Sequence, residues 1–549
     1  MDFIKSDDVT VIVLGYPYRY KGGSWLTAGE ALDQYNKRGA DFVGDLDGYF
    51  AIIIHDKAAG KFLVLMDRYG IYSIFFSRGA DQLIVSDSVE AICGLLERVH
   101  LNVQGILEFI DFAQMLGEKT HFEEIEKIPP ATILRVVDGL DVKMRKYWSA
   151  FAGGEEATVE EGEIIDIFNR HFERGLGMAK NASFALSGGM DSRTMLSASL
   201  PFKDRFHCYT FDVPRDGSIA KRICKDLSIT HNFYRLFEKP MEARIPEIAD
   251  RVIVRWNGMI NSVLLSFQDE YHCREGLGSD LHITGIGGEL MRPALIQHPE
   301  KVSGQEDIVR IFERRLRVNN VPGLFSGELA DNESELLRDS IRKEVNRIEL
   351  SDTVKIEKQF YLHHSMANFS SYGLTSSNRY MPNWNTFLCA PFLESLDRIT
   401  KWQKGRLLER IIIEQNSPYL AGVVGSAGQI ITGGRPGTRL LFDSVLIKGR
   451  HLVRRGINVP LRLATGRHII PKGWMFDFAG MLSRSNRSYV TDNLNHEDMI
   501  LQEYIDKKTL EAATRRLLKG SNNVCYPLTN IMSLELWLKR IGRVTDIAT

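Results

Sequence analysis

Hydrophobic and polar residues alternate over much of the first 90 positions of the chain. A two-residue period is typical of half-buried β-strands, and the Gly and Asp residues between the runs favour tight turns. In this region, only residues 28–38 have the spacing of an amphipathic helix. The pattern predicts an antiparallel, sandwich-like domain. Its predicted strands are residues 9–14, 50–55, 62–66, 72–76 and 83–85.

The pattern changes after a polar, Gly-rich segment that begins near residue 151. Strands that alternate with amphipathic helices indicate a parallel α/β sheet, and helical spacing between residues 304 and 420 predicts a helical cap on it. We therefore predict two domains, residues 1–150 and 151–549. The predicted elements of the second domain begin with helix 164–177, strand 183–186, helix 192–199, strand 206–211, helix 218–227 and strand 232–236.

Composition excludes several classes of protein. The 549 residues exceed what one core usually supports, and 44% hydrophobic and 25% charged residues are near the averages of soluble proteins. No segment approaches the roughly 20 apolar residues of a membrane helix. The start of the chain lacks the basic and apolar regions of a secretory signal, which predicts a cytoplasmic protein. Six scattered cysteines without a CxxC pair are predicted to be free thiols.

Charge is balanced overall but not locally. A formal net charge of −1 gives no general attraction to nucleic acid, so we predict no nucleic-acid partner. Residues 432–472 differ, because nine Lys and Arg residues there accompany a single acid, Asp443. This basic segment is either a solvated face or a docking surface for a partner protein, a leader peptide or a membrane.

Candidate chemistry follows the predicted strand that ends at Leu186, in the sequence Ser187-Gly188-Gly189-Met190-Asp191-Ser192. Two glycines let successive backbone N–H groups point inward, and the helix that follows adds favourable charge for an anion. The two serine hydroxyls add donors, and Asp191 suits Mg²⁺. A short Ser-Gly-Gly turn can also be purely structural. The whole segment, between a strand and a helix, predicts a nucleotide-binding loop.

This hexapeptide resembles the PP-loop of the N-type ATP pyrophosphatases, and the chain as a whole is similar to the asparagine synthetase-like family. Residues 212–220, 390–394 and 534–538 resemble further segments of that family. The resemblance implies ATP and Mg²⁺ as cofactors and places Phe211 beside the adenine. The residues it implies for nucleotide binding are Leu186, Ser187, Gly188, Gly189, Asp191, Ser192, Phe211 and Gly285.

A second glycine loop, residues 283–289, is similar to the family loop whose acid binds Mg²⁺ together with the Asp of the first loop. Glu289 takes the place of that acid, so Asp191 and Glu289 are the predicted metal ligands. The structural alternative is an ordinary acid at the start of a helix.

The amino-terminal half resembles a class II glutamine amidotransferase domain, an Ntn-hydrolase-like fold, through residues 44–51 and 67–71. Such a domain uses a cysteine directly after the initiator methionine as its nucleophile. Position 2 is Asp2, and residues 15–18 stand where the family has its glutamine-binding segment. We predict a degenerate domain without glutaminase activity that covers the synthetase site as a scaffold.

Two catalytic groups of the family are missing. Ile286 stands where a Glu or Tyr usually serves as general base, and residues 418–431 lack the Lys that would neutralise growing negative charge. Arg292, Arg379 or Arg435 could replace that Lys.

The resemblance implies a ligase or cyclase that forms AMP and pyrophosphate, adenylates a carboxylate and couples it to an amine. Lasso-peptide cyclases, β-lactam synthetases and members tied to surface polysaccharides or natural products are similar. The alternatives are an ammonia-dependent asparagine synthetase and a nucleotide-binding pseudoenzyme or scaffold. The amidotransferase-like half argues against a PP-loop enzyme that adenylates a nucleobase.

Overall fold

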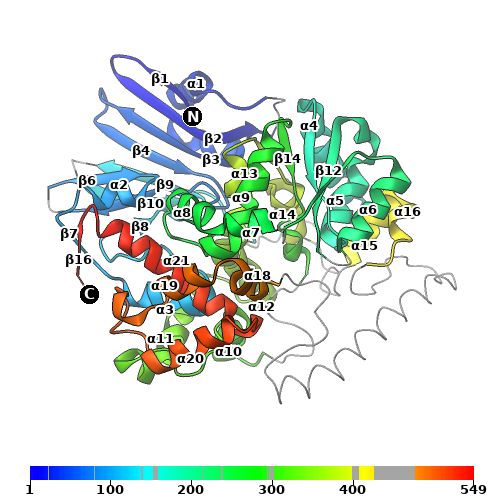
Figure 1. Cartoon of the computed structure of the whole chain (residues 1–549). Helices are drawn as coiled ribbons and strands as arrows, with labels where there is room; N and C mark the ends of the chain where they lie inside the picture. Colours follow the sequence, from blue (N-terminus) through cyan, green and yellow to red (C-terminus); the bar gives the residue numbers. More distant parts are fainter. Residues whose placement is uncertain are drawn as a thin grey trace.

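The computed structural model describes residues 1–548 except 21, 23, 80, 138–139, 152–158, 214–215, 237–238, 293–294, 296–301, 399–406 and 426–476. The predicted linker after residue 151 and the basic segment 432–472 lie outside the described residues. Figure 1 shows an antiparallel region formed by the amino-terminal part of the chain, a parallel sheet beside it, and a large group of helices below the antiparallel region.

Two antiparallel sheets form the amino-terminal region, as predicted. Apolar side chains of the two sheets, among them Val64, Met66 and Phe76, meet in one cluster. Helix α1 (Ala28–Arg38) packs on the other face of the large sheet and has the predicted bounds. The large sheet has the order β1 (Asp2–Lys5), β2 (Val9–Arg19), β3 (Leu46–Asp56), β4 (Lys61–Met66), β9 (Thr132–Val137) and β10 (Asp141–Lys146); the small one has the order β6 (Leu83–Ser86), β5 (Phe75–Arg78) and β8 (Glu126–Lys127).

The predicted strand 72–76 is wrong over its first half, because β5 begins only at Phe75. The buried carboxylate of Asp67 accepts backbone N–H groups from Tyr69 at 2.8 Å, Ile71 at 3.3 Å and Tyr72 at 2.9 Å. These bonds fold the segment into a turn, which the hydrophobic pattern of the sequence does not indicate.

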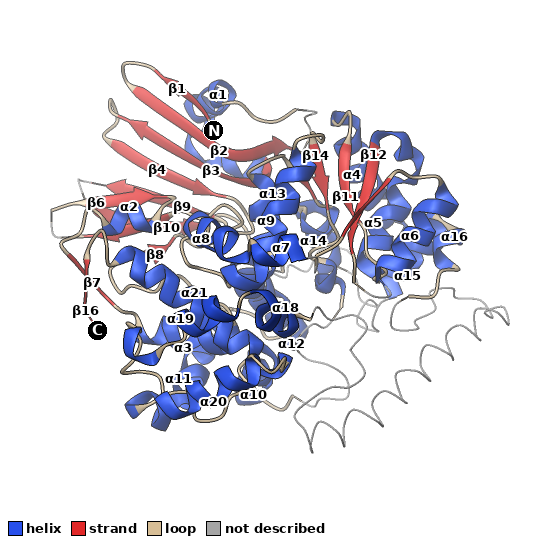
Figure 2. Ribbon diagram, in the orientation of Figure 1, coloured by secondary structure: helices blue, strands red, loops and turns tan. Residues whose placement is uncertain are grey.

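A parallel sheet follows, as the alternation of strands and helices predicts (Figure 2). Its order is β13 (His231–Tyr234), β12 (Phe206–Phe211), β11 (Ala182–Ala185), β14 (Leu281–Ile283) and β15 (Asn383–Trp384). The helices that alternate with the first strands are α4 (Glu161–Met178), α5 (Met190–Ser199) and α6 (Asp216–Leu227). The mixed α/β architecture is therefore confirmed.

The remaining described residues are mostly helical, including most of residues 304–420. That these helices form a cap on the parallel sheet stays a prediction. None of the described helices is long and apolar enough to cross a membrane. The six cysteines are free. The longer helices are α8 (Ile245–Arg255), α9 (Ser262–Gly276), α10 (Gln305–Leu316), α11 (Gly327–Asn346), α12 (Thr353–Phe360) with the π-helical η4 (Tyr361–Ser370), α13 (Tyr372–Asn378), α14 (Ala390–Asp397), α15 (Leu407–Asn416), α18 (Phe478–Ser485), α20 (Lys507–Leu517) and α21 (Cys525–Ile541).

The carboxy-terminal helix packs on the amino-terminal part of the chain. Side chains of α21 and of α3 (Val103–Phe112) belong to one apolar cluster. The side-chain amide of Asn530 donates to the carbonyls of Phe109 and Ile110, both at 3.1 Å. Strand β16 (Asp546–Ala548) also pairs in parallel with β7 (Arg98–His100). The two parts share a core, and the division at residue 150 stays a prediction.

We predict that Trp537→Ala destabilises the protein strongly. Trp537 is fully buried, and its ring packs on Gly258. Removing a buried aromatic side chain costs about 3–5 kcal/mol of unfolding free energy. The control Leu277→Ala removes a side chain that is 87% exposed and should change it by less than about 0.5 kcal/mol. Urea unfolding followed by circular dichroism measures both, and equal losses would contradict the packing of Trp537.

Candidate functional site

The first glycine loop joins β11 to α5 at the carboxyl end of the parallel sheet. The backbone N–H of Ser187 donates to the hydroxyl of Ser192 at 3.1 Å, and the two hydroxyl oxygens lie 3.0 Å apart. The N–H of Gly189 donates to the Ser187 hydroxyl at 3.1 Å. Thr210 of β12 donates to the carbonyl of Leu186 at 2.8 Å. Both hydroxyls therefore hold the turn in shape at the amino end of α5.

The second glycine loop packs directly on the first. A Cβ atom at Gly285 would lie 2.8 Å from the backbone nitrogen of Ser192, and one at Gly288 would lie 2.6 Å from Cγ of Asp191. Gly287 has φ +93°, a backbone conformation that residues with side chains rarely adopt. These distances leave no room for side chains, so the glycines are what allows the two loops to touch. The loops predicted from the sequence are thus brought together at one edge of the sheet.

Arg292 links the two loops to a third element. Its guanidinium donates to both carboxylate oxygens of Asp191, at 2.7 and 3.0 Å, and to Glu409 at 3.0 Å. Glu409 lies on α15 and is fully buried. The sequence named Arg292 as a candidate cation but missed Glu409. The sequence feature that could have indicated Glu409 is that it is the only acid among the mostly apolar residues 407–413 of that helix.

Glu289 stands beside this ion pair. Its Oε2 atom is buried and has no hydrogen-bond partner among the described residues. Burial and then the nearby charge of Asp191 raise the pKa of the Glu289 carboxyl above its usual value. The two predicted metal ligands are therefore close enough to repel each other when both are ionised.

Mg²⁺ can be tested against these residues. The described part of the chain holds no group of three or more His, Cys, Asp or Glu side chains that could bind a metal. Mg²⁺ usually takes only one or two carboxylates and completes its shell with water and phosphate oxygens. Asp191 and the unpartnered oxygen of Glu289 fit this requirement, provided that Arg292 releases Asp191.

Phe211 lies at the end of β12, where its half-buried ring contacts aromatic side chains of α9. Its centroid is 5.6 Å from that of Phe267 and 5.4 Å from that of Tyr271. The segment after β12 also approaches the first loop, because a Cβ atom at Gly188 would lie 2.6 Å from Oδ1 of Asp216. Phe211 thus ends the strand next to the one that carries the first loop.

The structure places Ile286 and two of the three candidate cations, Arg292 and Arg379. The side chain of Ile286 lies against α13, since a Cβ atom at Gly373 would be 3.2 Å from its Cδ1. Arg379 donates to the carbonyl of Arg255 at 3.2 Å, and within the described part of the chain it forms no hydrogen bond or ion pair with either loop. Arg435 lies outside the described residues. Of the three candidate cations, Arg292 is the one that the described structure places at the glycine loops.

Tyr361 is a further residue near the acids, and no sequence pattern indicates that it lies there. It begins the π-helical segment η4, and its hydroxyl lies 3.3 Å from that of Ser370. Burial raises the pKa of Tyr361 strongly, and Glu289 adds to this effect. The phenol therefore stays protonated and can act as a hydrogen-bond donor.

Known proteins are similar to this chain in its amino-terminal domain and over part of its length. Residues 19–148 match the family of glutamine amidotransferase domains. The putative asparagine synthetase [glutamine-hydrolyzing] 2 of Methanocaldococcus jannaschii is 22% identical over 231 residues, which cover 39% of this chain and 44% of that protein. Amidase chyE of Penicillium rubens is 20% identical over 300 residues, 48% of this chain and 44% of that protein.

Among solved structures, the glutamine phosphoribosylpyrophosphate amidotransferase from B. subtilis, in complex with ADP and GMP, is similar with a TM-score of 0.17 and 11% identity. The match covers 42% of this chain and 62% of that one. A TM-score this low carries no argument.

Residues 19–148 are thus similar to glutamine amidotransferase domains, and part of the chain is similar to a putative asparagine synthetase. The chain is asparagine synthetase-like, with a glutamine amidotransferase domain in its amino-terminal part, which confirms the predicted resemblance. The chain spans less than half the length of the curated relatives it matches, so its activity and substrates are matters for a proposal.

We predict that Gly285→Ala separates the two loops and destabilises the protein by about 1–3 kcal/mol, the usual cost of overpacking. Its Cβ atom would meet the backbone of Ser192, which cannot move aside as a flexible side chain can. Gly278→Ala is the matched control, because nothing lies within 4 Å of its Cβ position. Chemical unfolding of the two variants measures the difference. A Gly285→Ala protein as stable as the control would contradict the close approach.

Proposed function

We propose that this chain is an ATP-dependent ligase or cyclase that forms AMP and pyrophosphate, adenylates a carboxylate and couples it to an amine. The observation that carries the proposal is the contact between the two glycine loops, which sets Asp191 beside Glu289 at the carboxyl end of a parallel sheet. Ligands of such sheets bind at this edge. The asparagine synthetase-like relative supports the reaction class.

In this proposal the nucleotide lies across the first loop. The backbone N–H group of Gly188 and the amino end of α5 favour its phosphates. Leu186, Ser187, Ser192 and Gly285 complete the walls, and Phe211 lies beside the base. Bound between Asp191 and Glu289, Mg²⁺ would neutralise charge on the leaving pyrophosphate.

Arg292 takes over the role of the missing Lys. When Asp191 turns to the metal, Glu409 still holds the guanidinium at 3.0 Å, so its charge remains beside the first loop. A fixed cation at this place stabilises the negative charge that grows on the phosphates. Because Ile286 carries no protonatable group, the attacking amine has to arrive neutral or lose its proton to another group.

Glutaminase activity is absent in this proposal. Position 2 carries no thiol, and the carboxylate of Asp2 accepts the N–H of Ala28 at 2.7 Å. This side chain holds the start of α1 and so has a structural role. The amine then comes from ammonia, a separate molecule or the carboxylate substrate itself, as in the cyclases that the sequence resembles. We also propose a cytoplasmic protein, with the basic segment 432–472 as a docking site for a partner protein or leader peptide.

Two alternatives have support of their own. An asparagine synthetase is favoured by the Methanocaldococcus jannaschii relative. In this chain it would use ammonia, because position 2 carries no thiol. A nucleotide-binding pseudoenzyme is favoured by the pairing of both Asp191 oxygens with Arg292, which competes with a metal.

The test of the main proposal is the release of AMP. Purified protein is incubated with Mg-ATP and pooled cellular metabolites and peptides, and mass spectrometry follows AMP, pyrophosphate and any product lighter by one water than its parents. Asp191→Ala should abolish release, whereas Asp339→Ala, which removes an exposed acid of α11, should not. ATP binding without AMP from any pool would favour the pseudoenzyme, and AMP release by Asp191→Ala would contradict the site.

We predict opposite effects of Arg292→Gln on metal binding and on turnover. Without the guanidinium, the carboxylate of Asp191 loses one competitor of a metal ion, so Mn²⁺ as a probe for Mg²⁺ should bind about 5–30-fold more tightly, the factor that corresponds to about 1–2 kcal/mol. AMP release should fall, because the cation that stabilises the leaving pyrophosphate is lost. Electron paramagnetic resonance titration and AMP release measure the two quantities.

The control for this prediction addresses Glu409, which Arg292→Gln leaves buried with a lost partner. The double variant Arg292→Gln, Glu409→Gln should recover stability and keep the tighter Mn²⁺ binding. Weaker Mn²⁺ binding by both variants would show that Arg292 does not compete for Asp191.

A further inference from the structure

A cavity of about 270 Å³ lies between the amino-terminal antiparallel region and the helices α8 and α13. Both parts of the chain line it, and much of the lining is apolar or aromatic. Tyr16 and Tyr72 contribute from one side, and Trp256, Ile260 and Tyr372 from the other. A volume of this size suits a molecule as small as an amino acid.

Four charged side chains line this cavity: Asp87, Lys127, Arg255 and Arg379. The buried ammonium group of Lys127 donates to the carbonyl of Ala367 at 3.1 Å and to the side chain of Asn368 at 2.9 Å. Asp87 and Arg379 are both exposed and line it, and neither forms an ion pair within the described part of the chain. Both act on the same phenol: burial and the charge of Asp87 raise the pKa of Tyr72 to about 12, against the opposing effect of Arg379. The anion and the cation therefore face one cavity without neutralising each other in direct contact.

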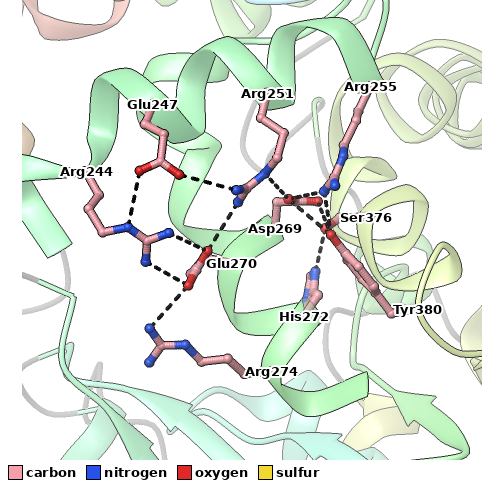
Figure 3. Close-up of polar contacts among 10 residues, drawn as sticks. All are labelled: Arg244, Glu247, Arg251, Arg255, Asp269, Glu270, His272, Arg274, Ser376 and Tyr380. Atoms are coloured by element: carbon pink, nitrogen blue, oxygen red, sulfur yellow. Dashed lines mark hydrogen bonds and ion pairs between the residues drawn. The ribbon is translucent and has the colours of Figure 1, made fainter. Parts of the chain in front are cut away.

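Arg255 also lines the cavity, but its guanidinium is paired with Asp269. Figure 3 shows its guanidinium on Asp269 and the hydroxyl of Tyr380. Next to it, Arg244, Arg251 and Arg274 converge on Glu270. This network joins α8 to α9 and to the residues after α13. It also fixes the Arg255 carbonyl, which accepts the hydrogen bond from Arg379.

Helix α13 connects the cavity with the second glycine loop. Its residues Thr375 and Asn378 line the cavity and donate to the carbonyls of Ile71 at 3.1 Å and Tyr49 at 3.3 Å, which anchors the helix to the amino-terminal region. Gly373, on the same helix, packs against Ile286 of the second loop. The cavity and the loop are therefore separated by a single short helix.

We propose that this cavity binds a small zwitterion with an apolar side chain, such as a hydrophobic amino acid. Arg379 pairs with its carboxylate, Asp87 pairs with its ammonium group, and the aromatic lining covers its side chain. The binding itself does not depend on the proposed ligase activity. That the zwitterion supplies the amine to the adenylated carboxylate rests on the proposed function.

The test uses three probes that share one side chain and differ in their charged groups: L-leucine, N-acetyl-L-leucine, which keeps the carboxylate alone, and L-leucinamide, which keeps the ammonium alone. Isothermal titration calorimetry without ATP measures their affinities. L-Leucine should bind saturably, and each analogue about tenfold more weakly or worse, because each loses one charge-assisted contact.

Variants assign each charge to its partner. Arg379→Gln should weaken L-leucine and N-acetyl-L-leucine about tenfold and leave L-leucinamide unchanged, and Asp87→Asn should show the reverse pattern. Arg487→Gln, at another exposed arginine, is the matched control and should bind all three probes as the unchanged protein does. Because these side chains are exposed, melting temperatures should stay the same.

Failure of the cavity proposal and failure of the ligase proposal give different results. No saturable L-leucine binding, or equal L-leucine affinity in the unchanged protein and in both variants, overturns the cavity proposal even where AMP release confirms the ligase. L-Leucine binding with the expected charge pattern supports the cavity, and absence of AMP from every pool would then refute only the ligase.

Discussion

The contact between the two glycine loops is the constraint on which the rest of the site depends. Because Gly285 and Gly288 have no side chains, the second loop reaches the backbone at Ser192 and the side chain of Asp191. This contact brings Glu289 to Asp191, and two ionised carboxylates at short range repel each other. Something positive has to offset that repulsion, and the described structure offers Arg292.

The charge around Arg292 is only partly balanced. Asp191, Glu289 and Glu409 are three acids around one guanidinium, and one oxygen of Glu289 has no hydrogen-bond partner within the described chain. A site that retains excess negative charge attracts a further cation, which is the electrostatic basis for proposing Mg²⁺ here. Glu409 matters because it is fully buried, so separating it from Arg292 would remove a positive partner from a buried acid. Arg292 is therefore held by two acids, through two hydrogen bonds to Asp191, whose carboxylate is 24% exposed, and through one to the buried Glu409.

The sequence predicts the features that follow from local patterns, but not those that depend on tertiary contacts. The bounds of α1 and β12 follow from their hydrophobic periods, and the first glycine loop follows from its place after a predicted strand. The second glycine loop was identified through the family resemblance. Glu409 and Tyr361 could not be found in this way, because α15 and η4 meet the loops only in the folded chain. The strand at 72–76 failed for a related reason: the side chain of Asp67 competes for the backbone N–H groups that a strand would use. The roles of the nucleotide and metal residues stay predictions.

The amino-terminal half fits the role of a scaffold in physical terms. Asp2, at the position of the expected nucleophile, holds the start of α1 through the N–H of Ala28. Side chains of α3 are buried against α21, so removing this half would expose a large apolar surface of the rest of the chain. The same half supplies the carbonyls of Tyr49 and Ile71 that anchor α13, the helix against which Ile286 rests. The amino-terminal half thus positions one wall of the proposed synthetase site and one side of the cavity beside it.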